Sequence, residues 1–448
     1  MAQSNFSWKN PQDWIPDAQC LAEVLHARHR WRLPLLLAGM LFAQGRRTVT
    51  TWLRAAGVSD DYQDYYYFLS SLGRQTRLVA MQLLLLLLRT VPLPSRVIAV
   101  IDDSPTKRYG KHVEGAAIHH NPTPGPADQQ FLYGHVWVTL SLAIRHPLFG
   151  ALALPLRALL YVREQTLAKI PEHRGWKFAT KLELAAELVE WLAMWLQIAK
   201  KTLWVVIDGG YTKTPFLKRA LAAGATIIGR LRKDAALFAP PPELPPGKKR
   251  NRGRPRKYGQ KMNLAKRAAH RHGWQTLTCV QYGKSVVKTY KTFIAMYQPT
   301  GGAIRVVIVK ELHGWFPFFS TDINASVSDI LEAFADRATI EQDFHDVKEV
   351  WGAGQQQVRN IWSNLAVYNL NLWMHTLVEL WAWNRPASEL CDRSSSPWDN
   401  AQRRPSHANR RAALRREIAG KELSLLAETH PLPRKILDIV SQLLALAA

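Results

Sequence analysis

The feature that most constrains the fold is a pair of apolar, β-branched runs that end in aspartate. The first is VIAVIDDS at 97–104, and the second is TLWVVIDGG at 202–210. Runs of this kind predict strands. Helical patterns at 179–200 and 216–224 flank the second run. Because strand and helix alternate here, we expect a mixed α/β layer with carboxylates at the ends of its strands.

The composition points to a polyanionic partner. The 448 residues suffice for about two to four domains, and a hydrophobic content of 47% argues for an ordered chain. Lys and Arg number 59 against 35 Asp and Glu, which leaves a net charge of +24. Each phosphate that a basic side chain neutralises releases counterions, so nucleic acid fits this excess best. A membrane surface or a ribosome is the alternative on charge alone.

The cysteines and the apolar runs favour a cytoplasmic protein without membrane contact. The cysteines, Cys20, Cys279 and Cys391, show no CxxC spacing, so we expect neither a zinc site nor a disulfide framework. The N-terminus lacks the pattern of a signal peptide. The run Leu83 to Leu88 is much shorter than the ~20 apolar residues of a membrane span and predicts a core helix.

Changes in composition and in hydrophobic pattern divide the chain into five regions. Helical spacing throughout the first region predicts a helical DNA-binding domain. The turn at Gly57 to Asp60 there suggests a helix-turn-helix, with a plain bundle that has a solvated basic face as the alternative. The regions are 1–95, helical; 96–233, first part of the α/β core; 234–320, basic loop and β-rich insertion; 321–383, second part of the core; and 384–448, basic and helical.

The third region begins with a Pro-, Gly- and Arg-rich stretch at 234–272, which predicts a flexible basic loop. Its GRPRK segment at 253–257 resembles arms that bind A·T-rich minor grooves, with Arg254 and Arg256 as the contacts, although short basic runs also arise by chance. The stretch 274–320 predicts successive strands.

The last third of the chain predicts helices and a loop. One long helix starts near Ser326 or Ser328, either of which is a plausible cap, and runs to about 352. Another apolar helix is expected at 361–383. The Arg-rich stretch 385–420 predicts a loop, followed by a final helix near 434–446.

Acidic side chains at informative positions suggest metal-dependent chemistry. Asp103, or its neighbour Asp102, closes the first strand, Asp208 closes the second, and Glu341 lies on the later helix. Carboxylate oxygens of this kind hold two Mg²⁺ ions roughly 3.5 to 4 Å apart, one to activate water or a 3′-hydroxyl and one to stabilise the leaving oxygen. Each aspartate taken alone also fits a structural role at the start of a loop.

Glu341 has an informative helical context. Phe334, Arg337, Glu341 and Lys348 fall near one face of a helix, so Arg337 and Lys348 could hold a DNA backbone beside the carboxylate. The alternative is an exposed helix with ordinary ion pairs of ~0.2 to 0.5 kcal/mol each. The other acids of this helix predict a solvated face: Asp336, Asp343, Asp346 and Glu349.

This segment resembles the Y-x2-R-x3-E-x6-K signature of the bacterial insertion-sequence DDE transposases, with Phe334 in the place of the tyrosine. The resemblance extends over about 97–380 and includes IDDSPTKRYGKHVEG and VVIDGGY. It implies a ribonuclease H-like core with a β-rich insertion before the glutamate. In these transposases the first aspartate usually precedes Ser or Thr, which favours Asp103 over Asp102.

The resemblance also implies a function. It suggests recognition of transposon ends, hydrolytic nicking, strand transfer to target DNA and often a hairpin, with two Mg²⁺ ions or Mn²⁺ in their place. A homodimer on double-stranded DNA and a bacterial, nucleoid-associated location follow. Trp274 or Trp315 would stack a flipped base, although both also fit a core role. A metal nuclease without strand transfer and a non-catalytic DNA-binding derivative remain alternatives.

Further basic residues are candidates for phosphate contact, with solvated faces as the alternative. They are Lys107, Arg108 and Lys111 after the first aspartate, Arg230 and Arg232 after a later strand, and Arg403, Arg404, Arg410, Arg411, Arg415 and Arg416 near the C-terminus.

Overall fold

The computed structural model describes residues 14–121, 129–242, 256–393, 398–400, 402–429 and 436. Its N-terminal region is helical, as the spacing predicts. The helices are α1 (Trp14–Ala22), α2 (Arg32–Phe42), α3 (Val49–Ala55), α4 (Tyr62–Arg74) and α5 (Thr76–Thr90). The leucine run lies in α5, where Leu83, Leu84, Leu86 and Leu87 are buried.

A mixed sheet forms the centre of the molecule. Its strands are β1 (Arg96–Lys107), β2 (Ala117–His120), β3 (Phe131–His146), β4 (Gly150–Tyr161), β5 (Thr202–Ile207), β6 (Thr226–Arg230), β7 (Leu237–Phe238), β8 (Lys261–Met262), β9 (Gln275–Gln281), β10 (Lys284–Tyr297), β11 (Gly302–Glu311) and β12 (Gly314–Ser320). The order is β2-β3-β1-β5-β6-β12-β11-β10-β7-β8, with β4 on β3 and β9 on β10. The pairs β1·β5 and β5·β6 are parallel, which confirms the mixed α/β prediction.

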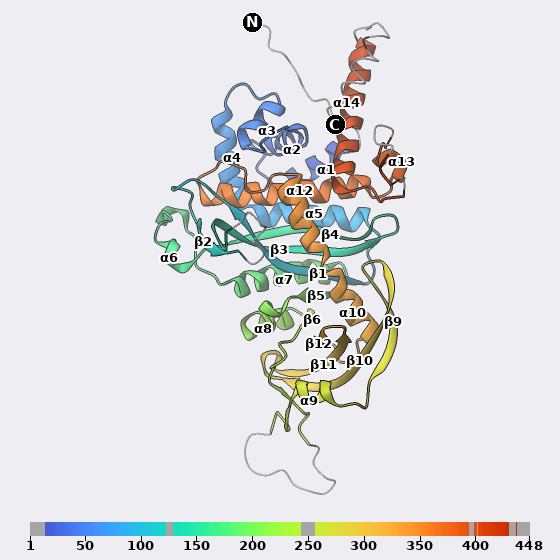
Figure 1. Ribbon diagram of the computed structural model, residues 1–448. Helices are drawn as coiled ribbons and strands as arrows, with labels where there is room; N and C mark the ends of the chain where they lie inside the picture. The colour runs from blue at the N-terminus through green and yellow to red at the C-terminus, as the bar shows by residue number, and fades with distance from the viewer. Residues whose placement is uncertain are drawn as a thin grey trace.

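Helices cover both faces of the sheet. In Figure 1, α12 (Ile361–Ala382) and α5 lie above β3 and β4, and α7 (Lys181–Ile198) lies below. Nearly every residue of α12 is buried, because α12 is enclosed by β4, α4 and α14 (His407–Thr429). Short elements complete this part of the fold: α6 (Glu164–Leu167), α8 (Thr214–Ala222), η1 (Glu172–Arg174) and η2 (Gly209–Tyr211).

The predicted β-rich insertion continues the central sheet. β12 pairs antiparallel with β6, so β9 to β12 extend the layer that carries β1 and β5. The short helix η3 (Gln298–Thr300) lies between β10 and β11.

The stretch 234–272 is more ordered than the loop prediction allows. Its described part contains β7, β8 and α9 (Leu264–Ala269), because the apolar side chains of Leu237 and Leu264 are buried in the core. Residues 243–255, which include Arg254, lie outside the described residues.

Two predictions for the last third of the chain are wrong. The long helix is divided into α10 (Val327–Asp336) and α11 (Thr339–Glu349), with a turn at Arg337 and Ala338 between them. The stretch 385–420 is not a loop, because it contains α13 (Ala387–Leu390) and most of α14. Of the predicted final helix at 434–446, only residue 436 belongs to the described part.

The start of the helix predicted near Ser326 or Ser328 is settled by one cap. Ser326 caps α10 by accepting a hydrogen bond from the amide of Asp329, and Ser328 bonds to Ser326 instead of capping. The thiols of Cys20, Cys279 and Cys391 are free. No helix in the described part of the chain has both the length and the apolarity needed to cross a bilayer.

Candidate active site

The two aspartate-bearing strands lie side by side. β1 and β5 are parallel and in register, with Ile101 opposite Ile207. Asp208 directly follows Ile207, so it lies beside Asp102. The prediction that the first aspartate closes its strand is wrong, because β1 continues past Asp102 and Asp103 to Lys107 in its pairing with β3. After Asp208 the chain turns at once, because the amide of Tyr211 donates to the Asp208 carbonyl at 3.1 Å. This turn holds Asp208 at the carboxyl ends of the parallel strands, where α/β proteins place their sites.

Asp102 and Asp103 interact with different elements, because successive side chains of a strand point to opposite faces. The carboxylate of Asp103 accepts from the Lys181 ammonium at 2.6 Å and from the Tyr211 hydroxyl at 2.9 Å. The carboxylate of Asp102 accepts from the Arg337 guanidinium at 2.6 Å. Lys181 begins α7, whereas Arg337 lies between α10 and α11. The two carboxylates therefore face helices from opposite sides of the sheet.

The pKa of the Tyr211 hydroxyl shows that the three aspartates lie close to it. Burial raises the pKa of the Tyr211 hydroxyl well above its ordinary value, and the negative charges of Asp103, Asp102 and Asp208 raise it further. Burial likewise raises the pKa of Asp102, and the positive charge of Arg337 opposes that rise. The edge of the sheet is therefore a concentration of negative charge that two cationic side chains partly neutralise.

Glu341 is connected to this edge through Arg337. The guanidinium donates its Nη2 hydrogen to Glu341 at 3.3 Å while its Nη1 holds Asp102. Arg337 is largely buried, with 15% of its side chain exposed, whereas Glu341 is 64% exposed. Glu341 lies in the first turn of α11, where the helix dipole favours a carboxylate. A single guanidinium thus joins the third acid to the first strand.

The other signature residues support this arrangement. The ring of Phe334 packs edge-on against Phe318 at 4.7 Å, and the guanidinium of Arg337 lies 5.8 Å from the Phe334 ring. The aromatic ring at position 334 therefore helps to orient Arg337. Lys348 is half-buried in α11, and burial lowers the pKa of its ammonium, with the charge of Glu349 opposing this effect.

The remaining predicted contacts lie around the sheet edge and the insertion. Lys107 is exposed at the end of β1, and Arg230 is exposed at the end of β6 with its guanidinium 4.6 Å from the Phe316 ring. Arg256 is exposed, and Arg254 lies outside the described residues.

Trp274 and Trp315 are half-buried in the insertion, and both pack against the hydrophobic core, as their alternative role predicted. Both rings line one shallow pocket of about 470 Å³. The Lys291 ammonium lies 4.6 Å from Trp274, and the Lys233 ammonium lies 5.1 Å from Trp315. Each ring therefore has one cation beside it, and the Lys291 side chain of the first pair is buried.

Several acids of α10 and α11 and several C-terminal arginines, which were predicted to be exposed, are buried. Asp336 pairs with Arg145 at 2.9 Å, and Asp343 lies on the face of α11 that packs against the sheet and α12. Asp346 also points inward, with 13% of its side chain exposed, so the solvated-face prediction is wrong for all three. Burial raises the pKa of Asp343 well above its ordinary value. The C-terminal arginines differ from expectation in the same way. Three of them are buried inside the fold and are not available to phosphates: Arg410, Arg411 and Arg415.

Lys181 and Tyr211 are the site residues that sequence reasoning missed. Tyr211 stands in the VVIDGGY motif but its hydroxyl had no assigned role. Lys181 is far from any acid in sequence, and nothing in its neighbourhood marks it.

A second cluster of metal-ligating side chains is buried between α12 and α14. His375, Glu379 and His407 bring potential ligand atoms within 4.8 Å of one another. The indole of Trp351 donates to Nε2 of His407 at 2.8 Å, and Nδ1 of His407 contacts Glu379 at 2.5 Å. Because an indole N–H only donates, His407 carries its proton on Nδ1 and keeps no lone pair for a metal.

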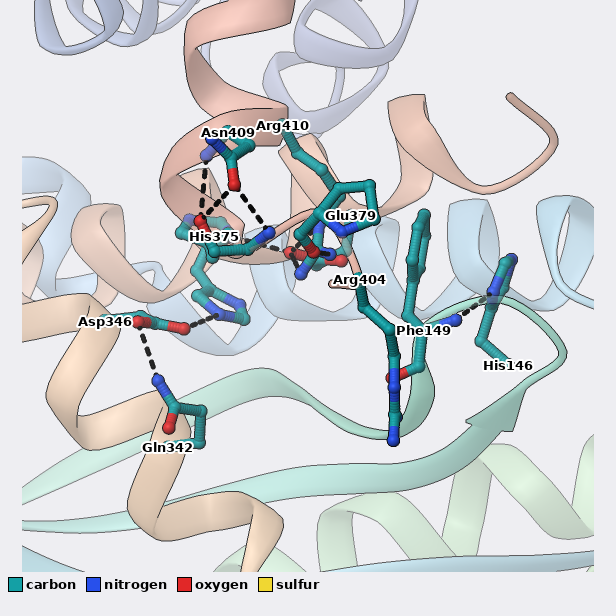
Figure 2. A network of polar contacts seen from close by, with 12 residues as sticks. His146, Phe149, Gln342, Asp346, His375, Glu379, Arg404, Asn409 and Arg410 are labelled. Carbon is teal, nitrogen blue, oxygen red and sulfur yellow. Dashed lines mark hydrogen bonds and ion pairs between the residues drawn. The ribbon is translucent and has the colours of Figure 1, made fainter. Parts of the chain in front are cut away.

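The charge of this cluster also disfavours a cation. The guanidinium of Arg410 lies 2.8 Å from the same Glu379 carboxylate that a metal would need. Figure 2 shows Arg410 beside Glu379 and, separately, His375 in contact with Asp346; the His375 ring joins the two groups by stacking on His407. We therefore regard the cluster as a polar network that joins helices.

Comparison with known proteins identifies one family. Residues 20–292, more than half of the chain, match the family model described as DDE superfamily endonuclease. The matched range contains Asp102, Asp103 and Asp208 and ends before Glu341. No curated protein matches the chain significantly.

Proposed function

Since this chain belongs to the DDE superfamily endonuclease family, we propose that it is a DNA transposase that binds transposon ends, cleaves them and transfers the strands to target DNA. The observation that carries the proposal is the junction of Asp102, Arg337 and Glu341 beside Asp103 and Asp208. This junction brings an acid from the second half of the core to the acids of the first half.

The donor set fits hard divalent cations. Asp208, Glu341 and one of the two adjacent aspartates would hold two Mg²⁺ ions, or Mn²⁺ in their place. The sequence resemblance favours Asp103 as the first ligand, whereas the side chain of Asp102 lies on the side of β1 that carries Arg337 and Glu341. Their oxygens suit Mg²⁺, and the combined charge that raises the pKa of Tyr211 marks an excess of negative charge that cations would offset. When bound, the ions would supply Lewis acidity to the attacking and leaving oxygens of phosphoryl transfer.

The protein's own side chains bind and orient the DNA in this proposal. Tyr211 donates to one oxygen of Asp103 and restricts its carboxylate, while Arg337 fixes Asp102 and Glu341 relative to each other. Phosphates would be held near the acids by Lys107, Lys348 and Arg230, and along the insertion by Arg254 and Arg256. Trp274 and Trp315 would offer rings for base stacking beside Lys291 and Lys233.

The regions of the chain divide the work as follows. Region 1–95 would bind transposon ends, and regions 96–233 and 321–383 would form the ribonuclease H-like catalytic core. Region 234–320 would contact DNA beside the core, and the basic helical region 384–448 would support α12 through buried arginines such as Arg410. Synapsis of two ends would require a homodimer on DNA, and such a protein would act at the bacterial nucleoid.

The test is cleavage of a labelled duplex that carries the DNA ends flanking the gene. We expect Mg²⁺-dependent cleavage by the wild type, and none by Asp208→Ala or Glu341→Ala, which should retain DNA binding. Unchanged cleavage by either variant would show that the substituted residue is not a catalytic metal ligand.

A second assay separates the alternatives. Joining of cleaved 3′ ends to a plasmid indicates a transposase, and cleavage without joining under any metal indicates a nuclease. DNA binding without any product indicates a non-catalytic derivative.

A further inference from the structure

The helix that carries Glu341 begins without a side-chain cap, and the Arg337 bridge links it to β1. α11 starts after the turn at Arg337 and Ala338, and its N-terminus has no side-chain cap. The chain on its N-terminal side is therefore not a continuous rigid helix. Besides the Arg337 bridge, the position of Glu341 depends on the contacts of the inward face of α11, where Ile340, Phe344 and Val347 supply apolar packing.

Two acids on α11 point inward, away from Glu341, toward one histidine. The Nε2 atom of His375 lies 3.8 Å from the carboxylate of Asp343 and 3.8 Å from that of Asp346. Asp346 also accepts from Gln342, one turn earlier on α11, at 3.0 Å. Figure 2 shows His375 directed at Asp346 from α12. The contact thus joins α11 to the most enclosed helix of the fold.

The opposite face of His375 is held by α14. Its ring stacks on His407 at 4.0 Å with the planes 19° apart. His407 is fixed in turn by Trp351 and by Glu379. Only 4% of the His375 side chain is exposed, so the ring has little freedom to move. The His375 side chain is therefore held in one place by α12 and α14, and its contacts with Asp343 and Asp346 fix α11 relative to these two helices.

We propose that His375 and Asp346 are positioning residues that set the distance of Glu341 from the aspartates of β1 and β5. This inference rests on the proposed function. Asp346 follows Glu341 by five residues on the same short helix, so a shift of α11 at Asp346 moves Glu341 with it. Supporting groups behind a ligand commonly change metal affinity by about 10- to 100-fold when removed. His375 touches no predicted ligand, and its effect passes through α11.

The test compares Mn²⁺ binding to the full-length protein without DNA, followed by electron paramagnetic resonance. We expect His375→Ala and the nearly isosteric Asp346→Asn to raise the Mn²⁺ dissociation constant about 10-fold. His375→Gln, whose amide can again donate toward Asp346, should restore part of the affinity. Cleavage assays should show the same shift in the Mg²⁺ concentration for half-maximal rate.

Asn369→Ala is the matched control. Asn369 is buried on α12 and bonds to Ala158 of β4 at 2.9 and 3.1 Å, so its loss destabilises the same helix through a contact outside α11. A purely structural role for His375 would lower the melting temperature in both variants and leave the Mn²⁺ affinity of both unchanged. That result would overturn the inference.

The failure of the inference is distinguishable from failure of the proposed function. If Glu341→Ala and Asp208→Ala weaken Mn²⁺ binding and abolish cleavage while His375→Ala and Asp346→Asn bind Mn²⁺ normally, only the positioning role is lost. If Glu341→Ala binds Mn²⁺ and cleaves DNA normally, the assignment of Glu341 fails, and the inference that rests on it fails too.

Discussion

Arg337 donates a hydrogen bond of 2.6 Å to the carboxylate of Asp102, which lies 235 positions earlier in the chain. This bond joins the α10–α11 turn to the middle of β1. Because the same guanidinium reaches Glu341, it decides how closely the two halves of the core approach.

Replacement of Arg337 should therefore impair cleavage even by a residue of equal charge. A lysine has one compact ammonium and does not reproduce the two-pronged contact of a guanidinium. We expect Arg337→Lys to reduce single-turnover cleavage by about 10-fold and Arg337→Ala by about 100-fold, as for loss of an electrostatic contact at other active sites. Wild-type cleavage by Arg337→Lys would contradict the bridging role.

The adjacent aspartates can be separated by paired substitution. With Asp103 as the first metal ligand, as the sequence resemblance implies, Asp103→Asn should abolish detectable cleavage. Asp102→Asn should retain activity reduced by about 10-fold, since Arg337 keeps Glu341 but loses part of its hold on β1. The reverse ranking in the same assay would transfer the role of first ligand to Asp102.

Lys181 should compete with bound cations for Asp103. Its ammonium lies 2.6 Å from the carboxylate, and 38% of the Lys181 side chain is exposed, so solvent weakens but does not remove its charge. We expect Lys181→Met to lower the Mn²⁺ dissociation constant by a few-fold in titrations without DNA. Weaker binding would indicate that Lys181 orients Asp103 for the metal.

The strands that carry the aspartates could be predicted from the sequence, because short apolar runs rich in β-branched residues favour strands over helices. The strand β4 was missed: its sequence, GALALPLRALLY, contains a proline and shows no alternation, and it is a strand because it pairs with β3 and lies under α12. Tertiary contacts decided this element.

Long-range pairs explain why the site was only partly predictable. Spacing placed Arg337 beside Glu341 on a helix, which the structure bears out as a contact, although the helix is interrupted there. The contacts of Asp103 with Lys181 and of Arg337 with Asp102 join residues far apart in sequence. The buried Arg410 was read as a phosphate contact because an arginine looks solvated until its partner, Glu379, is known.

A glycine at the α4–α12 crossing should control stability. A Cβ atom at Gly73 would lie 1.9 Å from the backbone oxygen of Trp362, which cannot move without shifting α12. We expect Gly73→Ala to destabilise the protein by about 1 to 3 kcal/mol, measured as a lower thermal midpoint. Gly420→Ala, where a Cβ meets open space, is the control and should be neutral or slightly stabilising. Equal midpoints for the two variants would argue against this close approach.

Acid should destabilise the fold through histidines that are buried uncharged. Burial lowers the pKa of His119 to about 4, that of His135 to about 3 and that of His407 to about 4. In the unfolded chain these rings take up protons near pH 6.5, so the unfolded state binds more protons below that value. Their contribution is complete above about pH 6.5 and is lost as the pH falls toward 4, by about 1.4 kcal/mol per pH unit for each proton.

His135 allows this acid sensitivity to be assigned to a single ring. Its Nδ1 accepts from Arg108 at 3.2 Å and its Nε2 lies 3.0 Å from the Glu114 carbonyl, so protonation would set a second cation against the arginine. Thermal midpoints between pH 8 and 4 should fall less steeply for His135→Gln than for the wild type, because one fewer proton is taken up on unfolding. Since Gln also alters packing, its midpoint at pH 8 serves as the reference. Parallel pH profiles for the two proteins would mean that His135 contributes nothing to the acid sensitivity.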